Sequence, residues 1–138
     1  MLEFAGRFSN PELLIKSFKY WSVVFKEMPS TLGHCVFVLN EETPDFSHVT
    51  SEQMAEFPKV CKWFEDKIKK LYGAKKFNYS AIMMKEHFVH FNVYPRYDNE
   101  VNLYGIQFVD EGWPKKVIDK KIELDKDVQR RIIDDLRN

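Results

Sequence analysis

Residues 88–96 read Phe-Val-His-Phe-Asn-Val-Tyr-Pro-Arg, and this segment constrains the fold more than any other part of the chain. Side chains alternate between the two faces of a β-strand, so one face is wholly apolar and the other carries a histidine and an amide. The apolar face holds Val89, Phe91 and Val93, and the opposite face holds Phe88, His90, Asn92 and Tyr94. Either His90 and Asn92 line an ordinary solvated face of a sheet, or they belong to a chemical site.

The composition predicts a folded domain with a substantial core. The 138 residues include twelve Phe, six Tyr and three Trp, and 44% of the chain is hydrophobic. Acidic and basic residues balance to a formal net charge of zero, which argues against a general nucleic-acid binder or membrane-surface binder. Cys35 and Cys61 form no C-x-x-C pair, so we expect reduced, buried thiols. The sequence contains no membrane-spanning apolar run and no signal peptide, and the expectation is a soluble cytoplasmic protein.

In the first half of the chain the pattern predicts a short helix, a hairpin and a long helix. Ser9 and Glu12 suggest a capping box with Pro11 at an early helical position, which would direct Leu13, Leu14 and Phe18 inward. Residues 20–25 and 34–39 are rich in aromatic and β-branched side chains and predict an antiparallel pair. A second capping box at Thr50 and Gln53 starts a long helix that ends at Gly73 and is interrupted near Pro58. Its apolar stripe is Met54, Phe57, Cys61, Phe64, Ile68 and Leu71.

The second half predicts another hairpin and a closing helix. Residues 77–84 and 88–94 are the expected strands, joined by a turn at 85–87, and 103–109 is expected to add a short edge strand. Residues 127–136 form an amphipathic helix whose apolar side is Val128, Ile132, Ile133 and Leu136. Two hairpins joined by a long helix predict an α+β fold, with an antiparallel sheet of about five strands and helices on one face.

Four segments, taken in order, resemble the histidine-triad (HIT) family, and in particular its bacterial-type branch similar to diadenosine polyphosphate hydrolases. They are 20–21 with 31–38 (Thr-Leu-Gly-His-Cys-Val-Phe-Val), 46–53, 77–97 with the triad-like strand, and 104–114. The triad strand of that family is usually written His-x-His-x-His-x-x-Pro-Arg. The resemblance covers roughly residues 18–114, and it implies a single HIT-like domain over 1–138, with 115–138 as a C-terminal helical extension.

The resemblance implies a mechanism that runs through His90. In the family the middle histidine attacks the α-phosphorus of a nucleotide, and water then releases the mononucleotide from a nucleotidyl-histidine intermediate. The first and third triad positions are Phe88 and Asn92, so the triad is degenerate. The backbone carbonyl of Phe88 still offers an acceptor that orients His90. Asn92 can donate a hydrogen bond but cannot act as a general acid, which predicts slow turnover or binding without turnover.

The resemblance marks other positions as nucleotide contacts, and most of them have an alternative role. The ribose-contacting residue of the family corresponds to Lys26, which cannot accept hydrogen bonds from ribose hydroxyls. Lys85 lies five residues before His90 and either holds phosphate by charge or is a solvated turn lysine. Arg96 and His34 are each either ligand contacts or structural residues. The resulting nucleotide- or phosphate-binding candidates are Asn92, Lys85, His34, Asn78, Phe88 and Arg96.

The sequence offers little support for cofactor or metal chemistry. His87 and His90 would face opposite sides of a strand, and no Cys or carboxylate cluster accompanies them, so we expect no metal and no cofactor. The five glycines form no phosphate-binding loop. We interpret His48 as solvated, and Tyr79 and Trp63 as packing residues.

Three hypotheses follow. The chain is a nucleotidyl hydrolase or transferase that acts on a dinucleoside polyphosphate or a nucleoside phosphoramidate. Alternatively, it is a catalytically impaired module that binds a purine nucleotide or dinucleotide, or it is a protein-interaction module. In each case the resemblance implies a homodimer, with no nucleic-acid or membrane partner.

Overall fold

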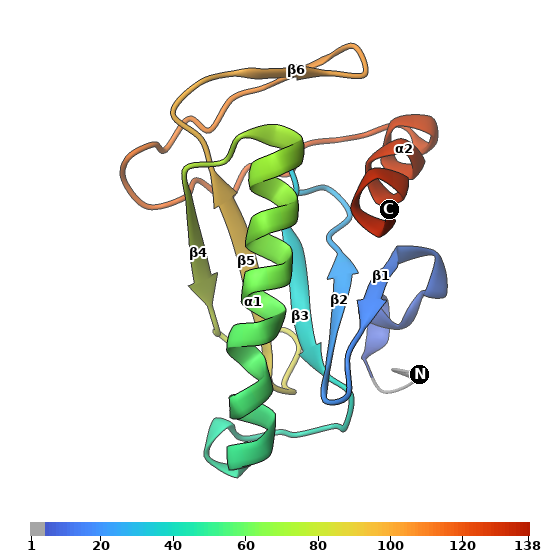
Figure 1. Cartoon of the computed structure of the whole chain (residues 1–138), viewed down its shortest axis with the longest axis vertical. Coiled ribbons are helices and arrows are strands. Elements are labelled where there is room, and N and C mark those ends of the chain that lie inside the picture. The colour runs from blue at the N-terminus through green and yellow to red at the C-terminus, as the bar shows by residue number, and fades with distance from the viewer. Residues whose placement is uncertain (1–4) are drawn as a thin grey trace.

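The computed structural model describes residues 5–138 and shows an α+β fold built on one five-stranded antiparallel sheet (Figure 1). The strand order is β1-β2-β3-β5-β4. The strands are β1 (Leu14–Ser17), β2 (Trp21–Phe25), β3 (Cys35–Leu39), β4 (Lys76–Ser80) and β5 (His90–Arg96). The helices are α1 (Ser51–Tyr72) and α2 (Lys126–Arg137), with short 3₁₀ turns η1 (Gly6–Ser9), η2 (Pro11–Leu13) and η3 (Phe46–His48). These elements confirm the expected fold class.

Both predicted antiparallel strand pairs form, although the strands of the second pair have other ends than the sequence predicts. β2 pairs antiparallel with β3, and every side chain of both strands is buried. β4 pairs antiparallel with β5, and β5 also pairs with β3, so the strand that carries His90 is interior to the sheet. A buried interior strand has fixed register, because a slip of one residue would move every side chain to the other face.

Helix α1 crosses one face of the sheet and closes the core (Figure 1). Thr50 and Gln53 form the predicted reciprocal capping box, and Gly73 ends the helix with a left-handed φ of 76°. Pro58 lies inside the helix and does not end it. The predicted apolar stripe is displaced, because the buried residues are Gln53, Val60, Phe64, Ile68 and Tyr72, whereas Met54 and Leu71 are exposed. Apolar residues lie on both flanks of this helix, so periodicity alone left its rotation undetermined.

The N-terminal segment corrects the first predicted helix. Ser9 donates its hydroxyl hydrogen to the carbonyl oxygen of Gly6, and Asn10 is the residue whose side chain caps the next turn. The chain then enters β1, which pairs with the edge of β2. Nucleating a helix this short costs free energy and yields few backbone hydrogen bonds. Pairing with the open edge of β2 instead satisfies backbone N–H and C=O groups directly.

Two further corrections concern the second half of the chain. β4 ends at Ser80, so the connection to β5 spans residues 81–89 rather than the three-residue turn at 85–87. The expected edge strand at 103–109 is instead a separate hairpin of β6 (Val101–Leu103) and β7 (Ile106–Phe108). Tyr104 and Gly105 both have positive φ at its turn, a geometry usually marked by Asn-Gly and easily missed in a Tyr-Gly pair.

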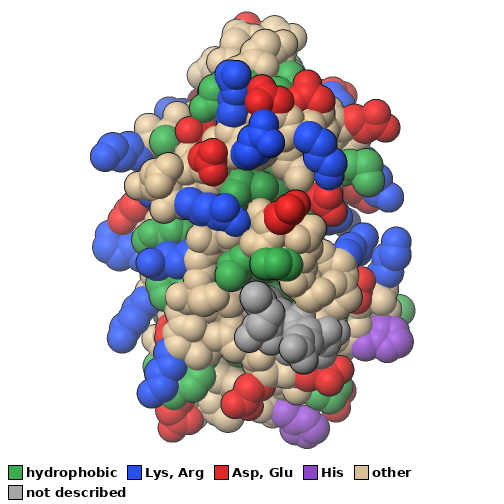
Figure 2. Space-filling view, turned by 90° about the vertical axis from the view of Figure 1, so that its right-hand side faces the viewer, with side chains coloured by type: hydrophobic (Ala, Val, Ile, Leu, Met, Phe, Trp, Pro, Cys, Tyr) green, Lys and Arg blue, Asp and Glu red, His purple; other side chains and the backbone are tan. Residues whose placement is uncertain are grey.

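Helix α2 packs beside β1 on the side of the sheet that α1 covers (Figure 1). The predicted apolar side of this helix is confirmed, and the same core includes Ala5 from the start of the described chain and Leu136 from its end. On the side of the molecule that Figure 2 shows, acidic and basic side chains are interspersed around small hydrophobic areas. Among residues 5–138, no helix combines the length and the apolarity that crossing a membrane would require.

Candidate nucleotide-binding face of the sheet

The registers of four strands place polar side chains in rows across the face of the sheet opposite α1. Each row continues from β2 through β3 and β5 to β4, because paired residues in antiparallel strands lie directly side by side. Backbone hydrogen bonding extends the β2–β3 pairing to Lys26 and His34, and the ring of His34 lies 4.3 Å from that of Tyr94. The first row is therefore Lys26, His34, Tyr94 and Asn78, and the second includes Asn92 beside Ser80.

A pocket of about 570 Å³ lies over these two rows. Its floor is formed by the polar residues of the rows, and its walls come from the N-terminal segment, the connection after β4 and residues 116–121. The lining residues are Arg7, Lys26, His34, Asn78, Ser80, Ile82, Lys85, Asn92, Tyr94, Lys116, Val117, Asp119 and Lys121. The structure thus brings four of the six nucleotide- or phosphate-binding candidates, Asn92, Lys85, His34 and Asn78, into one pocket.

A hydrogen-bonded relay fixes the orientation of Asn92. The backbone N–H of Ser30 donates to Nδ1 of His34 at 3.1 Å, so the ring proton of neutral His34 is on Nε2. Nε2 then donates to Oδ1 of Asn92 at 2.9 Å. The amide oxygen of Asn92 is occupied by this bond, and its NH₂ group is left to donate into the pocket.

His34 remains neutral under ordinary conditions. Burial lowers the pKa of His34 to about 4, because the charged imidazolium would lose hydration in an almost fully enclosed position. The neighbouring Lys26 acts in the same direction, whereas the bond to Asn92 opposes the shift. His34 therefore lies in the floor of the pocket as an almost fully enclosed, neutral group that orients Asn92.

Asn78 is oriented in a similar way from the other side. Its Oδ1 accepts a 2.6 Å hydrogen bond from Nη1 of Arg96, which leaves the Asn78 NH₂ group as a donor. Arg96 is buried and forms a bidentate ion pair with Asp110, with Nε–Oδ2 at 2.7 Å, and it also donates to the carbonyl oxygen of Lys115. These contacts use the guanidinium inside the protein, so the geometry favours the structural alternative for Arg96.

His90 has the orientation that the resemblance implies. Its Nδ1 lies 2.9 Å from the carbonyl oxygen of Phe88, and a carbonyl only accepts, so Nδ1 carries the proton. Neutral His90 therefore keeps a lone pair on Nε2. Burial is the largest effect on the pKa of His90 and lowers it, which favours this neutral form at pH 7.

His90 is enclosed, and it does not line the large pocket. Only 5% of its surface is exposed, and its ring lies 5.7 Å from that of Phe8 and 5.3 Å from that of Phe88. An ion pair at 3.5 Å between Arg7 and Glu86 joins the N-terminal segment to the connection after β4 beside this cluster. On the strand His90 is two residues from Asn92, which places it about 7 Å beyond the pocket floor on the same face.

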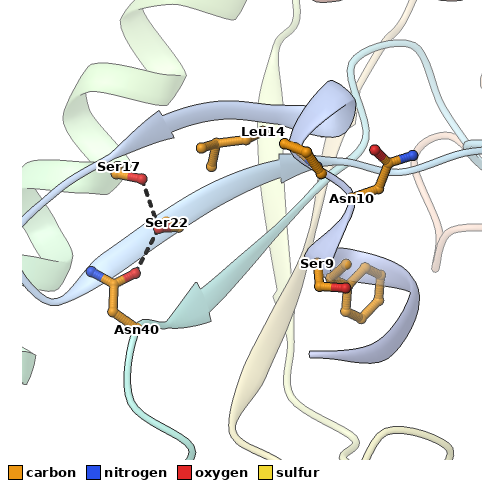
Figure 3. Close-up of a pocket in the computed structure, with 8 residues that line it drawn as sticks. Ser9, Asn10, Leu14, Ser17, Ser22 and Asn40 are labelled. Atoms are coloured by element: carbon orange, nitrogen blue, oxygen red, sulfur yellow. Dashed lines mark hydrogen bonds between the residues drawn. The ribbon is translucent and has the colours of Figure 1, made fainter. Parts of the chain in front are cut away.

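A second pocket of about 210 Å³ lies on the other side of Phe8, between the N-terminal turns and the edge of β1 and β2 (Figure 3). Three of its polar side chains bond to one another: the hydroxyl oxygens of Ser17 and Ser22 lie 3.1 Å apart, and Ser22 donates to Asn40 at 2.6 Å. Among residues 5–138, no charged side chain lines this pocket. The arrangement suits solvent or a small neutral group rather than a phosphate.

The remaining sequence candidates lie away from the large pocket. His48 is exposed in η3, and Trp63 and Tyr79 make edge contacts with other aromatic rings. Cys35 is buried and Cys61 half-buried, and both are free thiols. Within residues 5–138, no group of three or more His, Cys, Asp or Glu side chains has a geometry that could hold a metal ion.

Sequence reasoning missed several residues that the structure brings to this face. The sequence pattern predicts Ser80 in the middle of a strand, and only its pairing with Asn92 identifies it as part of the pocket floor. Phe8 was not singled out, because no local pattern shows that an N-terminal residue covers His90. Lys116 and Lys121 belong to a charged segment without regular secondary structure, and only the tertiary fold brings that segment to the pocket.

Comparisons with known proteins show where this fold occurs. No family model and no curated protein matches the chain in sequence. A hypothetical histidine triad nucleotide-binding protein from Sulfolobus tokodaii superimposes with a TM-score of 0.68 at 15% identity, covering 91% of this chain and 80% of that one. A histidine triad protein from Bradyrhizobium japonicum gives a TM-score of 0.67 at 14% identity, over 91% and 90%. The diadenosine triphosphate hydrolase of Plasmodium falciparum gives 0.59 at 16%, over 68% and 67%. The fold is therefore HIT-like.

Proposed function

We propose that this protein binds a purine nucleotide on the polar rows of the sheet and cleaves it slowly at the α-phosphate through His90. The observation that carries the proposal is the orientation of His90, whose Nδ1–H is held by the Phe88 carbonyl oxygen at 2.9 Å. An imidazole held in this way directs an unprotonated Nε2 away from its own backbone. His90 lies two residues from Asn92 on β5, so its side chain is on the same face of the sheet as the pocket.

The reaction follows from this geometry in two steps. In the first step, the Nε2 lone pair of His90 forms a bond to phosphorus while the bond from phosphorus to the leaving oxygen or nitrogen breaks. In the second step, water attacks the same phosphorus, the N–P bond breaks and the mononucleotide leaves. Asn92 and Asn78 supply NH₂ donors, and Lys85 supplies positive charge for the phosphate oxygens. With no acidic histidine at position 92, solvent must protonate the leaving group.

The substrate class is a dinucleoside polyphosphate or a nucleoside phosphoramidate. Purified protein is incubated with diadenosine tetraphosphate and with adenosine phosphoramidate, and AMP release is compared with that of His90→Ala. We expect release from the wild-type protein at a rate at least ten times that of the variant. Equal rates in the two proteins would contradict the assignment of His90.

A second candidate function is nucleotide binding without turnover. Its support is specific: Phe8 encloses His90, and Asn92 stands where a general acid would act. In that case AMP raises the melting temperature of the wild-type protein and of His90→Ala alike, while AMP release stays at background. A protein-interaction module predicts no thermal shift with any nucleotide.

We also propose that the protein forms a homodimer, as the resemblance implies. The edge strand β4 leaves one side of its backbone without a strand partner in the five-stranded sheet, and exposed Ile82 and Met84 follow it closely. Sedimentation equilibrium measures the mass in solution directly. A mass that corresponds to the single chain at micromolar concentration would contradict the dimer.

A further inference from the structure

The charged side chains that line the large pocket are almost all cationic. Arg7, Lys26, Lys85, Lys116 and Lys121 line it, and Asp119 is the single acidic residue among its lining side chains. Arg7 is paired with Glu86, but the four lysines form no ion pair within residues 5–138. Uncompensated cations around a cavity attract a ligand that carries several negative charges.

Lys26 lies at one end of the pocket, and Asn78 and Ser80 lie at the other. Three strand spacings separate β2 from β4, which corresponds to a span of about 14 Å across the sheet. A single phosphate group cannot contact both ends. The middle of the row is formed by neutral His34 and by the ring of Tyr94, surfaces that suit a sugar or a base rather than a phosphate.

The environment of Lys26 is unusual for a lysine without an ionic partner. The residue is half-buried, and burial is the main cause that lowers its pKa. Arg7, Lys121 and, more weakly, Lys85 add repulsion, and Asp119 opposes them. Asp119 is itself exposed and accepts a hydrogen bond from the Ser30 hydroxyl at 3.2 Å. An anion placed between Lys26, Arg7 and Lys121 would relieve this repulsion.

We propose that Lys26, with Arg7 and Lys121, forms a second anion subsite, and that the ligand is a nucleotide phosphorylated on its ribose as well as at its 5′ position. This inference rests on the proposed nucleotide function and specifies its ligand. The 5′-phosphate lies over Asn92, Ser80 and Lys85, beside His90. The ribose phosphate lies at Lys26, and the neutral part of the nucleotide covers His34 and Tyr94.

The test is a binding comparison on the full chain by isothermal titration calorimetry. The probes are AMP, ADP and adenosine 3′,5′-bisphosphate, since the last two carry the same number of phosphates in different places. We expect the bisphosphate to bind roughly tenfold more tightly than either AMP or ADP. Lys26→Gln should lower the affinity for the bisphosphate by about tenfold and so remove its advantage over AMP and ADP. Lys70→Gln, which removes one exposed charge from α1 on the opposite face, should change neither.

Each alternative result has its own meaning. Equal affinities for the bisphosphate and AMP would overturn the second subsite and leave the proposed nucleotide function standing. ADP binding as tightly as the bisphosphate would overturn the two-ended geometry. Failure of all three probes to bind would overturn both this inference and the proposed function. A bisphosphate advantage that persists in Lys26→Gln would overturn the assignment of Lys26.

Discussion

Two asparagines define the chemistry of the pocket, because a buried partner holds each amide oxygen. His34 donates to Asn92, and Arg96 donates to Asn78, so both amides present NH₂ groups to a ligand. This division of roles gives a floor with few fixed charges the hydrogen-bond donors that the proposed phosphate binding requires. The sequence identified all four residues, but only the hydrogen bonds of the structure show that His34 and Arg96 orient the two asparagines and leave their NH₂ groups free to donate.

Asn92→Asp tests the orientation of this amide. The replacement has nearly the same shape and still accepts from His34 through one oxygen, but it presents a carboxylate instead of an NH₂ donor. We expect AMP affinity to fall more than tenfold, because a donor is exchanged for a like charge. Calorimetric titration measures the loss, and circular dichroism verifies that the fold is intact. Unchanged affinity would show that Asn92 does not contact phosphate.

The depressed pKa of His34 predicts a loss of stability in acid. Unfolded histidine titrates near 6.5 and the folded residue near 4, so the unfolded state binds more protons between these values. Stability is therefore complete above about pH 6.5 and falls as the pH drops toward 4, by about 3 kcal/mol at most from this group. Urea unfolding at pH 7 and pH 4.5 measures the change. His34→Gln, which cannot titrate, should lose clearly less stability over the same interval.

The N-terminal segment is the element that bears most directly on the proposed activity, because it covers His90. Residues 6–13 form two 3₁₀ turns, and Phe8 from the first of them packs on His90. A substrate reaches Nε2 of His90 only if this turn moves aside. Local opening of a short, weakly hydrogen-bonded segment costs far less than global unfolding, so such a movement is compatible with a stable core.

Phe8→Ala should expose His90. Diethyl pyrocarbonate modifies accessible neutral imidazoles, and peptide mapping by mass spectrometry locates the modified residue. We expect His90 to react at least several times faster in the variant than in the wild-type protein, because the ring that covers it is gone. Exposed His48 is the internal control and should react equally in both. Equal rates at His90 would mean that Phe8 does not control access.

Helix α1 and the strands β2 and β3 were predictable, whereas the turns before β1 and the connection after β4 were not. The capping box at Thr50 and Gln53 and the left-handed Gly73 fixed both ends of α1, since each signal is local. The turns before β1 and the connection at 81–89 depend on contacts with distant strands, and periodicity carries no information about those contacts. For the same reason the sequence did not indicate the roles of Phe8 and Ser80. Both lie outside residues 88–96, the pattern that identified His90.

Over the whole molecule, the two strand pairings of β5 link the fold to the proposed chemistry. An interior strand pinned between β3 and β4 holds His90 and Asn92 on the same face, and the α1 side of that strand is packed with apolar groups. The predicted fold class is confirmed because hydrophobic alternation and a long capped helix are sufficient to specify it. The pocket was not predictable, since residues as far apart in the sequence as Arg7 and Lys121 line it.

The central claim is that Nε2 of His90 attacks phosphorus, and its most direct measurement is the covalent intermediate itself. Protein mixed with adenosine phosphoramidate is quenched within milliseconds to seconds under conditions that preserve N–P bonds, and intact-mass and peptide spectra are recorded. The prediction is an adenylyl group on the peptide that contains His90, present in the wild-type protein and missing in His90→Ala. AMP formation with no adduct at any time point, or an equal adduct in His90→Ala, would contradict the claim.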